Sequence, residues 1–441
     1  MKTTVSNWSN YPVKDAMLTY WRGENIPTAS KNWIARGLGR CYGDASLSDQ
    51  IFSTVKHNHI LAFAPESGMV CCQSGVSLHD LLEVFVPKGW FLPVTPGTKF
   101  ITVGGALASD IHGKNHHVAG CFGDHVTSCT LILANGERMS CSPTENSEVF
   151  NATRGGMGLT GMIDTVTFKL KKIESCYIKQ RQIKAKNLDE VLTLFDTYKS
   201  YTYSMAWIDC LKGGKNFGRS IMMMGEHATL EELNSNQRKK PLTGKVGRDI
   251  NMPINLPGFV LNALSVKAFN WLYFHKNVKK VIENTVHYDP FFYPLDSILH
   301  WNRMYGKGGF VQYQFVLPIN NSEEGLVKIM NRIRQKGWGS FLSVLKLFGK
   351  QESLISFPME GYTLALDFPL KKGLFAFLDE LDELVLELGG RIYLTKDARM
   401  KAATFENSYP HSQEFLSILK KINPDLIIQS DLAKRLSILP S

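Results

Sequence analysis

The sequence predicts an α+β protein in two parts, in which antiparallel strands are joined by tight turns and mostly short helices. Three observations support this. The chain has 441 residues, and chains beyond about 250–300 residues usually divide between two cores. Stretches with apolar residues at every second position alternate with stretches at helical spacing. A strong two-residue hairpin signal, Asn135-Gly136, follows one of these apolar stretches.

The first third of the chain is expected to hold short elements with frequent turns. Leu78, Leu81, Leu82 and Phe85 have the spacing of one helix face. The hairpin signal predicts that the stretch before it pairs antiparallel with the stretch after it. Strands are expected over 70–74, 126–134, 138–142 and 162–170, and helices over 78–86 and 145–152.

From about residue 175 the elements become longer, which predicts a second domain. Strands are expected over 201–209, 310–317, 341–348, 362–368 and 391–394, and helices over 187–200, 323–336, 373–388, 398–406 and 411–421. Residues 240–262 are rich in proline and glycine, which predicts a mobile loop that faces a partner. The tail after residue 391 is expected to rejoin the first domain.

Composition and charge narrow the classes of function. The net charge is +10, and basic residues are scattered without interleaved aromatics, which argues against nucleic acid and favours a phosphate-bearing ligand at a membrane surface. No stretch approaches the ~18 apolar residues of a membrane span, and residues 1–20 lack the apolar core of a signal peptide. All eight cysteines precede residue 211 in no metal-binding spacing. We therefore expect free thiols and a cytoplasmic protein, with peripheral contact at the inner membrane surface as a further option.

Residues 93–125 are the most informative stretch of the chain. Glycines alternate there with hydrogen-bond donors such as Thr98, Thr102, Ser109, His112 and Lys114. Glycine lets main-chain N–H groups approach a ligand without a Cβ in the way, and successive exposed N–H groups form anion-holding concavities. The stretch therefore predicts a cradle for a large anion.

Two other motif interpretations are less favoured. Gly156, Gly158 and Gly161 match the G-x-G-x-x-G string, but a helix precedes them and a strand follows, the reverse of a Rossmann site. The spacing of His112 and His116 would suit a metal on a helix. Gly113 interrupts any helix there, and no metal is expected.

Several segments resemble the FAD-binding regions of the vanillyl-alcohol-oxidase/PCMH flavoprotein superfamily, and more narrowly the oxidases of decaprenylphosphoryl-β-D-ribose within it. In the first part these segments are 35–44, 96–98, 102–105 and 110–117. The resemblance continues through 201–207, 301–303, 312–315, 346–349, 367–369 and 395–397, so it runs nearly end to end.

The resemblance implies a PCMH-type FAD-binding domain over residues 7–175, completed by 391–441, and a substrate-binding domain over 176–390 built on an antiparallel sheet. It implies non-covalent FAD, because the loop that often carries a flavin-linking His in the superfamily holds Arg40, Cys41 and Tyr42 here. The cofactor-binding residues that it implies are Arg36, Gly37, Gly39, Arg40, Cys41, Tyr42, Gly43, Asp44, Gly97, Thr98, Thr102, Val103, Gly104, Gly105, Ser109, Asp110, Ile111, His112, Gly113, Ile163, Ser204 and Tyr393.

Two residues are candidates for the chemistry. Oxidation of a secondary alcohol needs a hydride acceptor and a group that removes the hydroxyl proton. By resemblance Lys396 and His112 lie near the flavin and the substrate, and the sequence leaves open which of them is the base.

The expected substrate pocket draws on several strands. Lys346 lies in an apolar strand, where a buried cation is costly unless a cavity or partner receives it. Gln312 and Gln314 lie on one face of their strand. The full expected set is Lys114, Gln312, Gln314, Lys346, Tyr293 and Trp207.

The resemblance implies oxidation of the 2′-hydroxyl of a polyprenyl-phosphoryl pentose to a ketone, the first half of an epimerisation that a short-chain reductase partner would complete. Mycobacterial members carry other residues where Met205, Thr363 and Ala365 stand here, which leaves the particular sugar open. The alternatives are a soluble sugar or aldonolactone oxidase of the same superfamily and, in another class, a flavin-free protein that binds anionic lipid.

Overall fold

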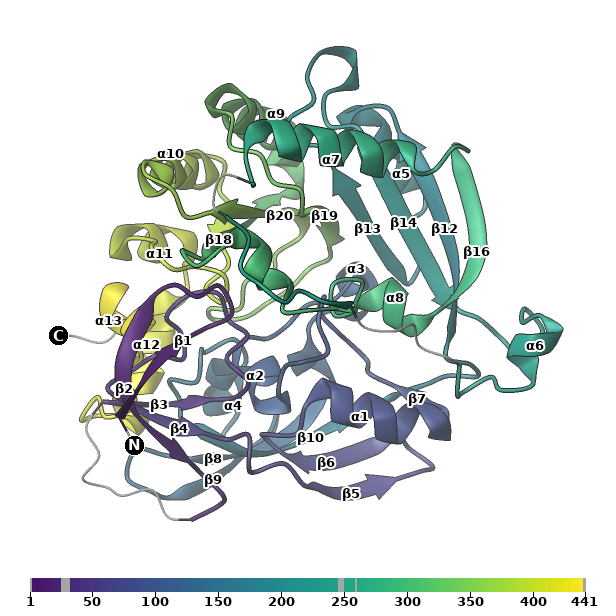
Figure 1. Cartoon of the computed structure of the whole chain (residues 1–441). Helices are drawn as coiled ribbons and strands as arrows, with labels where there is room; N and C mark the ends of the chain where they lie inside the picture. Colours follow the sequence, from purple (N-terminus) through teal and green to yellow (C-terminus); the bar gives the residue numbers. More distant parts are fainter. Residues whose placement is uncertain (1, 25–31, 245–249, 258–259, 439–441) are drawn as a thin grey trace.

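The computed structural model describes residues 2–24, 32–244, 250–257 and 260–438. Figure 1 shows two parts, one above the other. The first part is built mainly from residues 2–172, and the second mainly from residues 177–392. Helices and antiparallel sheets are mixed in both, so the predicted α+β class is confirmed.

The first part contains two main sheets, ordered β1-β2-β4-β3 and β5-β6-β10-β8-β9. Their strands are β1 (Lys2–Ser6), β2 (Val13–Tyr20), β3 (Trp33–Arg36), β4 (Gln50–Ser53), β5 (Ile60–Ala64), β6 (Met69–Gln73), β8 (Val126–Ile132), β9 (Arg138–Cys141) and β10 (Met162–Lys169). The helices and short strands among them are α1 (Leu78–Phe85), η1 (Val86–Lys88), β7 (Trp90–Phe91), α2 (Val103–Ala108), α3 (His116–Ala119), η2 (Phe122–His125), α4 (Ser147–Thr153) and β11 (Lys171–Lys172).

The predicted hairpin is present in the first part. Strand β8 pairs antiparallel with β9, and Ile132 lies opposite Arg138 across the turn. Gly136 has φ 84°, a left-handed conformation that glycine adopts without strain. Strands β1, β2, β3, β4 and β5 have no counterpart among the predicted elements. Strand β2 exposes residues on both faces, which hides its alternation.

The second part contains one eight-stranded antiparallel sheet, ordered β16-β12-β14-β13-β19-β20-β18-β21. Its strands are β12 (Tyr177–Ala185), β13 (Tyr203–Ile208), β14 (Ser220–His227), β16 (Val281–His287), β18 (Phe310–Pro318), β19 (Ser343–Phe348), β20 (Gly361–Pro369) and β21 (Arg391–Ile392). Helices α5 (Leu188–Thr197), α9 (Ile319–Lys336) and α10 (Leu374–Glu387) pack against it.

Shorter elements connect these strands and close the chain. They are η3 (Gly214–Asn216), α6 (Ser235–Arg238), β15 (Ile250–Asn251), α7 (Ala263–His275), α8 (Tyr288–Phe292), β17 (Ile298–Leu299), η4 (Trp301–Tyr305), α11 (Ala402–Ser408), α12 (Ser412–Ile422) and α13 (Asp431–Arg435). The C-terminal tail returns to the first part, because Ile428 forms a parallel bridge with Trp33 and α12 packs on α4.

The predicted strand 391–394 is shorter in the structure. Only Arg391 and Ile392 pair with β18, after which the N–H groups of Lys396 and Asp397 both donate to the Tyr393 carbonyl at 3.0 and 3.1 Å. This turn directs Lys396 away from the sheet edge.

The predicted loop 240–262 is only partly described, since residues 245–249 and 258–259 lie outside the described residues. Its described part includes β15, which pairs in parallel with β17. Arg303 holds this segment by donating from Nη1 to the Met252 carbonyl at 2.9 Å. Among the residues that the structure describes, no helix is long and apolar enough to cross a membrane.

Candidate active site

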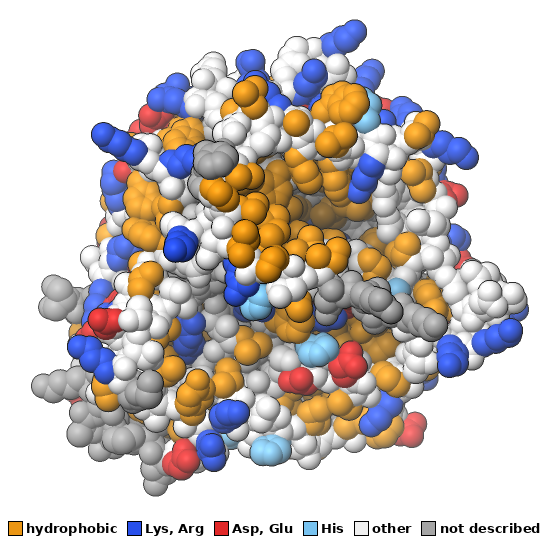
Figure 2. Space-filling model, viewed as in Figure 1, with side chains coloured by type: hydrophobic (Ala, Val, Ile, Leu, Met, Phe, Trp, Pro, Cys, Tyr) orange, Lys and Arg blue, Asp and Glu red, His pale blue; other side chains and the backbone are white. Residues whose placement is uncertain are grey.

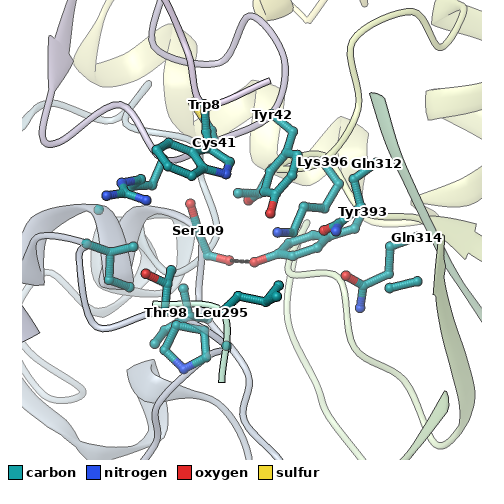
Figure 3. A pocket seen from close by; sticks show the side chains of 18 of the residues that line it. Trp8, Cys41, Tyr42, Thr98, Ser109, Leu295, Gln312, Gln314, Tyr393 and Lys396 are labelled. Carbon is teal, nitrogen blue, oxygen red and sulfur yellow. Dashed lines mark hydrogen bonds between the residues drawn. The ribbon is translucent and has the colours of Figure 1, made fainter. Parts of the chain in front are cut away.

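A cavity of about 800 Å³ lies between the two parts of the molecule, and both parts line it. Pockets for small molecules and cofactors usually have about 300–1,000 Å³. Figure 2 shows the hollow on the face viewed there, with hydrophobic side chains gathered around it. Figure 3 shows how residues from distant segments, such as Trp8, Thr98 and Lys396, point into this space.

The wall from the first part is made of glycine-rich loops. A Cβ at Gly37 would lie 2.2 Å from Thr102 Oγ1, so only glycine lets these two loops meet. At Gly97, by contrast, a Cβ would meet no atom within 4 Å. Gly97 lines the cavity, and its main chain is therefore open to whatever occupies that end of the space.

The wall from the second part is one face of the eight-stranded sheet. Alternate residues of β13, β18, β19 and β20, with one residue of β14, line the cavity, because side chains in a strand alternate between the two faces. The lining residues are Met205 and Trp207 from β13, Met223 from β14, Gln312 and Gln314 from β18, Val344 and Lys346 from β19, and Thr363, Ala365 and Asp367 from β20. The intervening residues, such as Leu345, Leu364 and Leu366, are fully buried in the core.

Lys396 reaches the cavity beside this sheet face. Its Nζ lies 3.8 Å from the centroid of the Tyr42 ring, a cation–π geometry. The pKa of Lys396 is lowered to about 7, because burial and the charge of Lys346 outweigh the opposing effect of the negative charge of Asp367. A lysine with this pKa titrates near neutral pH, whereas an ordinary lysine titrates near pH ~10.4.

Asp367 is buried and hydrogen-bonded within the sheet wall. It accepts hydrogen bonds from Gln312 Nε2 at 2.5 Å and from the Tyr305 hydroxyl at 3.1 Å. Burial raises the pKa of Asp367 to about 6, against the effect of these two donors and of Lys396. The carboxylate thus lies where it tunes the charge of Lys396.

His112 is bound to the sheet wall as a neutral imidazole. Gln314 Nε2 donates to His112 Nε2 at 3.0 Å and to Thr363 Oγ1 at 3.2 Å, and the Thr363 hydroxyl donates to the Phe315 carbonyl at 2.7 Å. Since the amide nitrogen only donates, the His112 proton is on Nδ1. Burial, followed by Lys346, holds the pKa of His112 well below its usual range.

Two further lysines line the cavity. Burial lowers the pKa of Lys346 to about 8, and no hydrogen bond or ion pair joins it to another described residue. Burial and Lys346 lower the pKa of Lys114 to about 7. Lys114 donates to the Phe291 carbonyl and lies 4.5 Å from the centroid of the Phe291 ring.

At the end of the cavity formed by residues 36–46, cations lie against aromatic and main-chain groups. The Arg40 guanidinium lies 3.8 Å from the centroid of the Trp8 ring. Arg36 donates from Nη2 to the Ser6 carbonyl at 2.8 Å. Cys41 Sγ lies 3.4 Å from Ser46 Oγ, and burial raises the pKa of this thiol.

Most of the residues expected from the sequence lie in the cavity wall. They are Lys396, His112, Lys114, Gln312, Gln314, Lys346, Trp207, Arg36, Gly37, Gly39, Arg40, Cys41, Tyr42, Gly97, Thr98, Thr102, Gly104, Gly105, Ser109, Ile111, Ile163 and Tyr393. The cavity thus brings together residues from both parts of the chain, and their roles in binding and catalysis stay predictions.

Seven expected residues lie behind the wall. Tyr293 is fully buried and its hydroxyl lies 2.6 Å from Thr95 Oγ1. Asp44 forms two 2.8 Å hydrogen bonds with Arg435, and Asp110 accepts from the Ser356 hydroxyl at 2.7 Å. Val103 and Ser204 are buried.

Two of the seven are glycines that make room for backbone. A Cβ at Gly43 would lie 1.7 Å from the Asp397 carbonyl oxygen, and one at Gly113 would lie 2.8 Å from that of Thr95. The structure gives these seven residues packing or hydrogen-bonding partners behind the wall, and their roles in binding stay predictions.

Several cavity residues were not among the expected ones. Asp367 shares the alternation of β20 with Thr363 and Ala365, so a strand-face argument would have found it. Trp8, Val266, Phe269 and Tyr273 also line the cavity. Nothing in their local sequence signals it, because their positions depend on long-range packing.

The cavity fits an extended dinucleotide cofactor. Its wall carries main chain open to a ligand at Gly97 and a deep polar end around Gln314 and Lys396. The G-x-G-x-x-G segment contributes Met157, Gly158 and Gly161 to the same wall, and Gly158 has φ 78°. It is a tight turn of this cavity and forms no dinucleotide site of its own.

Comparisons with known proteins agree with this geometry. Residues 26–142 match the FAD binding domain family. The chain is 39% identical over 414 residues to decaprenylphosphoryl-β-D-ribose oxidase of Mycolicibacterium smegmatis, covering 92% of this chain and 89% of the relative. It is 31% identical over 375 residues to an uncharacterized protein in the mprA 5′ region of Streptomyces coelicolor, covering 82% of this chain and 100% of the relative.

A more distant group matches about a third of the chain. L-gulonolactone oxidase of Bos taurus is 31% identical over 156 residues, 34% of each chain. The end-to-end relative therefore defines the family more narrowly than the flavin fold does. The chain is an FAD-dependent oxidoreductase and belongs to the family of decaprenylphosphoryl-β-D-ribose oxidase.

Proposed function

We propose that the protein oxidises the 2′-hydroxyl of a polyprenyl-phosphoryl pentose to a 2′-keto sugar. The observation that carries the proposal is a single cavity with lysines at its polar end and apolar side chains at its rim. Lys114, Lys346 and Lys396 supply the cations, and α7 supplies Val266 and Phe269. A phosphate joined to a long hydrocarbon needs both kinds of surface in continuity.

The two parts of the molecule would divide the work. We propose that residues 7–175 with 391–441 hold FAD, without a covalent bond, and that residues 176–390 hold the substrate. The Cys41 thiol supports non-covalent binding, because burial raises its pKa and the thiolate is the reactive form. Bound FAD supplies the hydride acceptor for the alcohol carbon.

Lys396 is the proposed base. With its pKa lowered to about 7, much of it is a neutral amine at physiological pH and accepts the hydroxyl proton while the carbon loses hydride. His112 is less suited, because its Nε2 lone pair receives the Gln314 amide hydrogen at 3.0 Å. We assign it to positioning. Lys346, still cationic at neutral pH, would hold the phosphate.

The ketone product is a reactive intermediate that a reductase of opposite facial preference would convert to the epimeric alcohol. We therefore propose a short-chain reductase as the partner. Ala365 and Thr363 line the substrate side of the cavity, and their side chains set how closely a sugar can approach the sheet.

The test is anaerobic reduction of the bound flavin. It is monitored as the loss of the visible absorbance of the flavin. The purified holoenzyme is mixed with polyprenyl-phosphoryl ribose, polyprenyl-phosphoryl arabinose, free ribose, ribose 5-phosphate and L-gulonolactone. Rapid bleaching is expected only with a lipid-linked pentose, and mass spectrometry of the product should show the loss of two hydrogens.

The other outcomes separate the alternatives. Bleaching by L-gulonolactone but by no lipid-linked sugar would replace the proposal with an aldonolactone oxidase. Bleaching by no sugar in a sample that retains FAD would remove the whole substrate class.

A further inference from the structure

Helix α7 is apolar on two opposite faces, although it lies at the surface. It borders the upper end of the second part in Figure 1. Helices that are hydrophobic all round are normally buried in a core or in a membrane. The apolar residues of its inner face pack toward the cavity. Its outer face has no partner among the described residues.

The inner face closes the cavity and is tied down by one polar contact. Val266, Phe269 and Tyr273 line the cavity. Asn270 is fully buried and donates from Nδ2 to Asp209 Oδ1 at 2.8 Å. Packing of the inner face and the Asn270–Asp209 hydrogen bond fix the orientation of the helix. The opposite face of the helix is therefore directed away from the cavity.

The outer face carries Leu264, Trp271 and Leu272. They are 77%, 55% and 62% exposed. Their i, i+7, i+8 spacing places them on one stripe. Large apolar side chains gathered on one exposed stripe indicate an interaction surface rather than the scattered exposure of ordinary surfaces.

Positive charge surrounds this stripe. Between residues 250 and 282 the chain has four lysines and no acidic residue. Lys276 lies 3.7 Å from the centroid of the Tyr273 ring, and Lys280 pairs with Glu190 at 2.7 Å. Lys267, Lys276 and Lys279 are all exposed, and no ion pair joins any of them to a described residue.

We propose that the outer face of α7 binds an anionic lipid bilayer. Leucine and tryptophan side chains on one stripe, flanked by lysines, are the composition of helices that lie in the interface plane. Because the inner face of the same helix lines the cavity, binding there brings the cavity rim to the lipid surface. The reason for such docking, access to a lipid-linked substrate, rests on the function proposed above.

The experiment measures flotation of the holoenzyme with vesicles, in the absence of any sugar. Vesicles of phosphatidylcholine and phosphatidylglycerol in equal parts are compared with vesicles of phosphatidylcholine alone. We expect tighter binding to the anionic vesicles. The triple variant Leu264→Gln/Trp271→Gln/Leu272→Gln should weaken that binding at least about tenfold, since the buried apolar area is lost. Lys276→Gln/Lys279→Gln should weaken it about fivefold per lysine.

A matched control uses exposed apolar residues elsewhere on the molecule. Val13 and Tyr20 on β2 are 59% and 55% exposed, and Val13→Thr/Tyr20→Thr should bind vesicles as the unaltered protein does. Retained FAD absorbance and an unchanged melting temperature would establish that the α7 variants are folded.

The contrary outcomes are distinct. Vesicle binding that the triple variant retains, or no binding at all, would overturn the membrane proposal. Self-association that the triple variant abolishes, without vesicle binding, would assign the face to a second copy of the chain. Failure of flavin bleaching with every sugar would remove the proposed function and leave the vesicle result intact.

Discussion

The two walls of the cavity are built on different principles. The wall from the first part uses main chain, with glycines where loops must touch, as at Gly37, or stay open, as at Gly97. The wall from the second part uses side chains on one face of a sheet, such as Gln314, Lys346 and Asp367. A main-chain wall suits a large cofactor that must be held, whereas a side-chain wall suits a reacting group whose protons must be controlled.

The largest expected effect comes from removing the amine at the boundary of the two walls. Lys396→Met should lower the rate of anaerobic flavin reduction by about 10²–10⁴, the usual contribution of a positioned acid–base group. FAD should remain bound, because the main-chain wall is untouched. Stopped-flow absorbance with the lipid-linked pentose measures the rate.

The control for this change is Lys401→Met. Lys401 is exposed and pairs with Asp379 at 3.0 Å, away from the cavity lining. It should reduce flavin at the unaltered rate. If Lys396→Met keeps more than half of the rate, Lys396 is not the base and His112 becomes the candidate to test.

A side chain placed in the main-chain wall should lower the affinity for FAD without changing the stability of the FAD-free protein. Gly97→Leu meets no atom within 4 Å of its Cβ position, so the melting temperature of the FAD-free protein should stay the same. FAD affinity should fall by at least about tenfold, since the added atoms take space that the cofactor needs. Fluorescence titration with FAD measures the affinity.

Gly308 offers the matched substitution. It also has no neighbour within 4 Å of its Cβ position, but it is exposed and does not line the cavity. Gly308→Leu should leave FAD affinity unchanged. Equal affinity in the Gly97 and Gly308 variants would show that this end of the cavity does not hold the cofactor.

The coupling between Lys396 and the sheet wall should appear in the pH profile. The rate of flavin reduction should rise with pH through about 7, as the Lys396 ammonium loses its proton. Asp367 raises the pKa of Lys396, so Asp367→Asn should move the midpoint to lower pH. A midpoint that stays in place or moves upward would contradict this coupling.

The smallest expected effect concerns stability. Lys346 has a folded-state pKa of about 8 because it is buried. Its unfolded-state pKa is about 10.4. The unfolded chain therefore binds more protons between these values, and stability should rise with pH over that window. Lys346→Met should stabilise the FAD-free protein at pH 7 by about 0.5–2 kcal/mol.

Chemical unfolding at pH 7 and at pH 10 measures this effect. The gain from Lys346→Met should shrink at pH 10, where the amine is already neutral in the folded protein. The rate of flavin reduction by a lipid-phosphate substrate should fall in the same variant. A loss of stability at pH 7 would mean that Lys346 has a stabilising partner.

The sequence allowed the local elements to be predicted where their signals are local. The Asn135-Gly136 turn requires φ > 0 and joins two strands whatever surrounds it. Strand β2 was not predicted, because it exposes residues on both faces. Helix α7 was not predicted, because it is apolar on both faces. The order of polar and apolar residues in each element depends on whether solvent or protein lies against each face. Tertiary packing decides that.

By itself the sequence determined the flavin loops, the α+β class and the polar faces of the strands, because glycine spacing and alternation are properties of consecutive residues. It left open which residue is the base, and it did not distinguish Tyr293, Asp44 and Asp110, which lie behind the cavity wall, from the residues that line it. Only the tertiary structure brought Gln314 to His112 and Asp367 near Lys396. The pKa of each group depends on neighbours far away in the chain, because burial and charge are set by the assembled cavity.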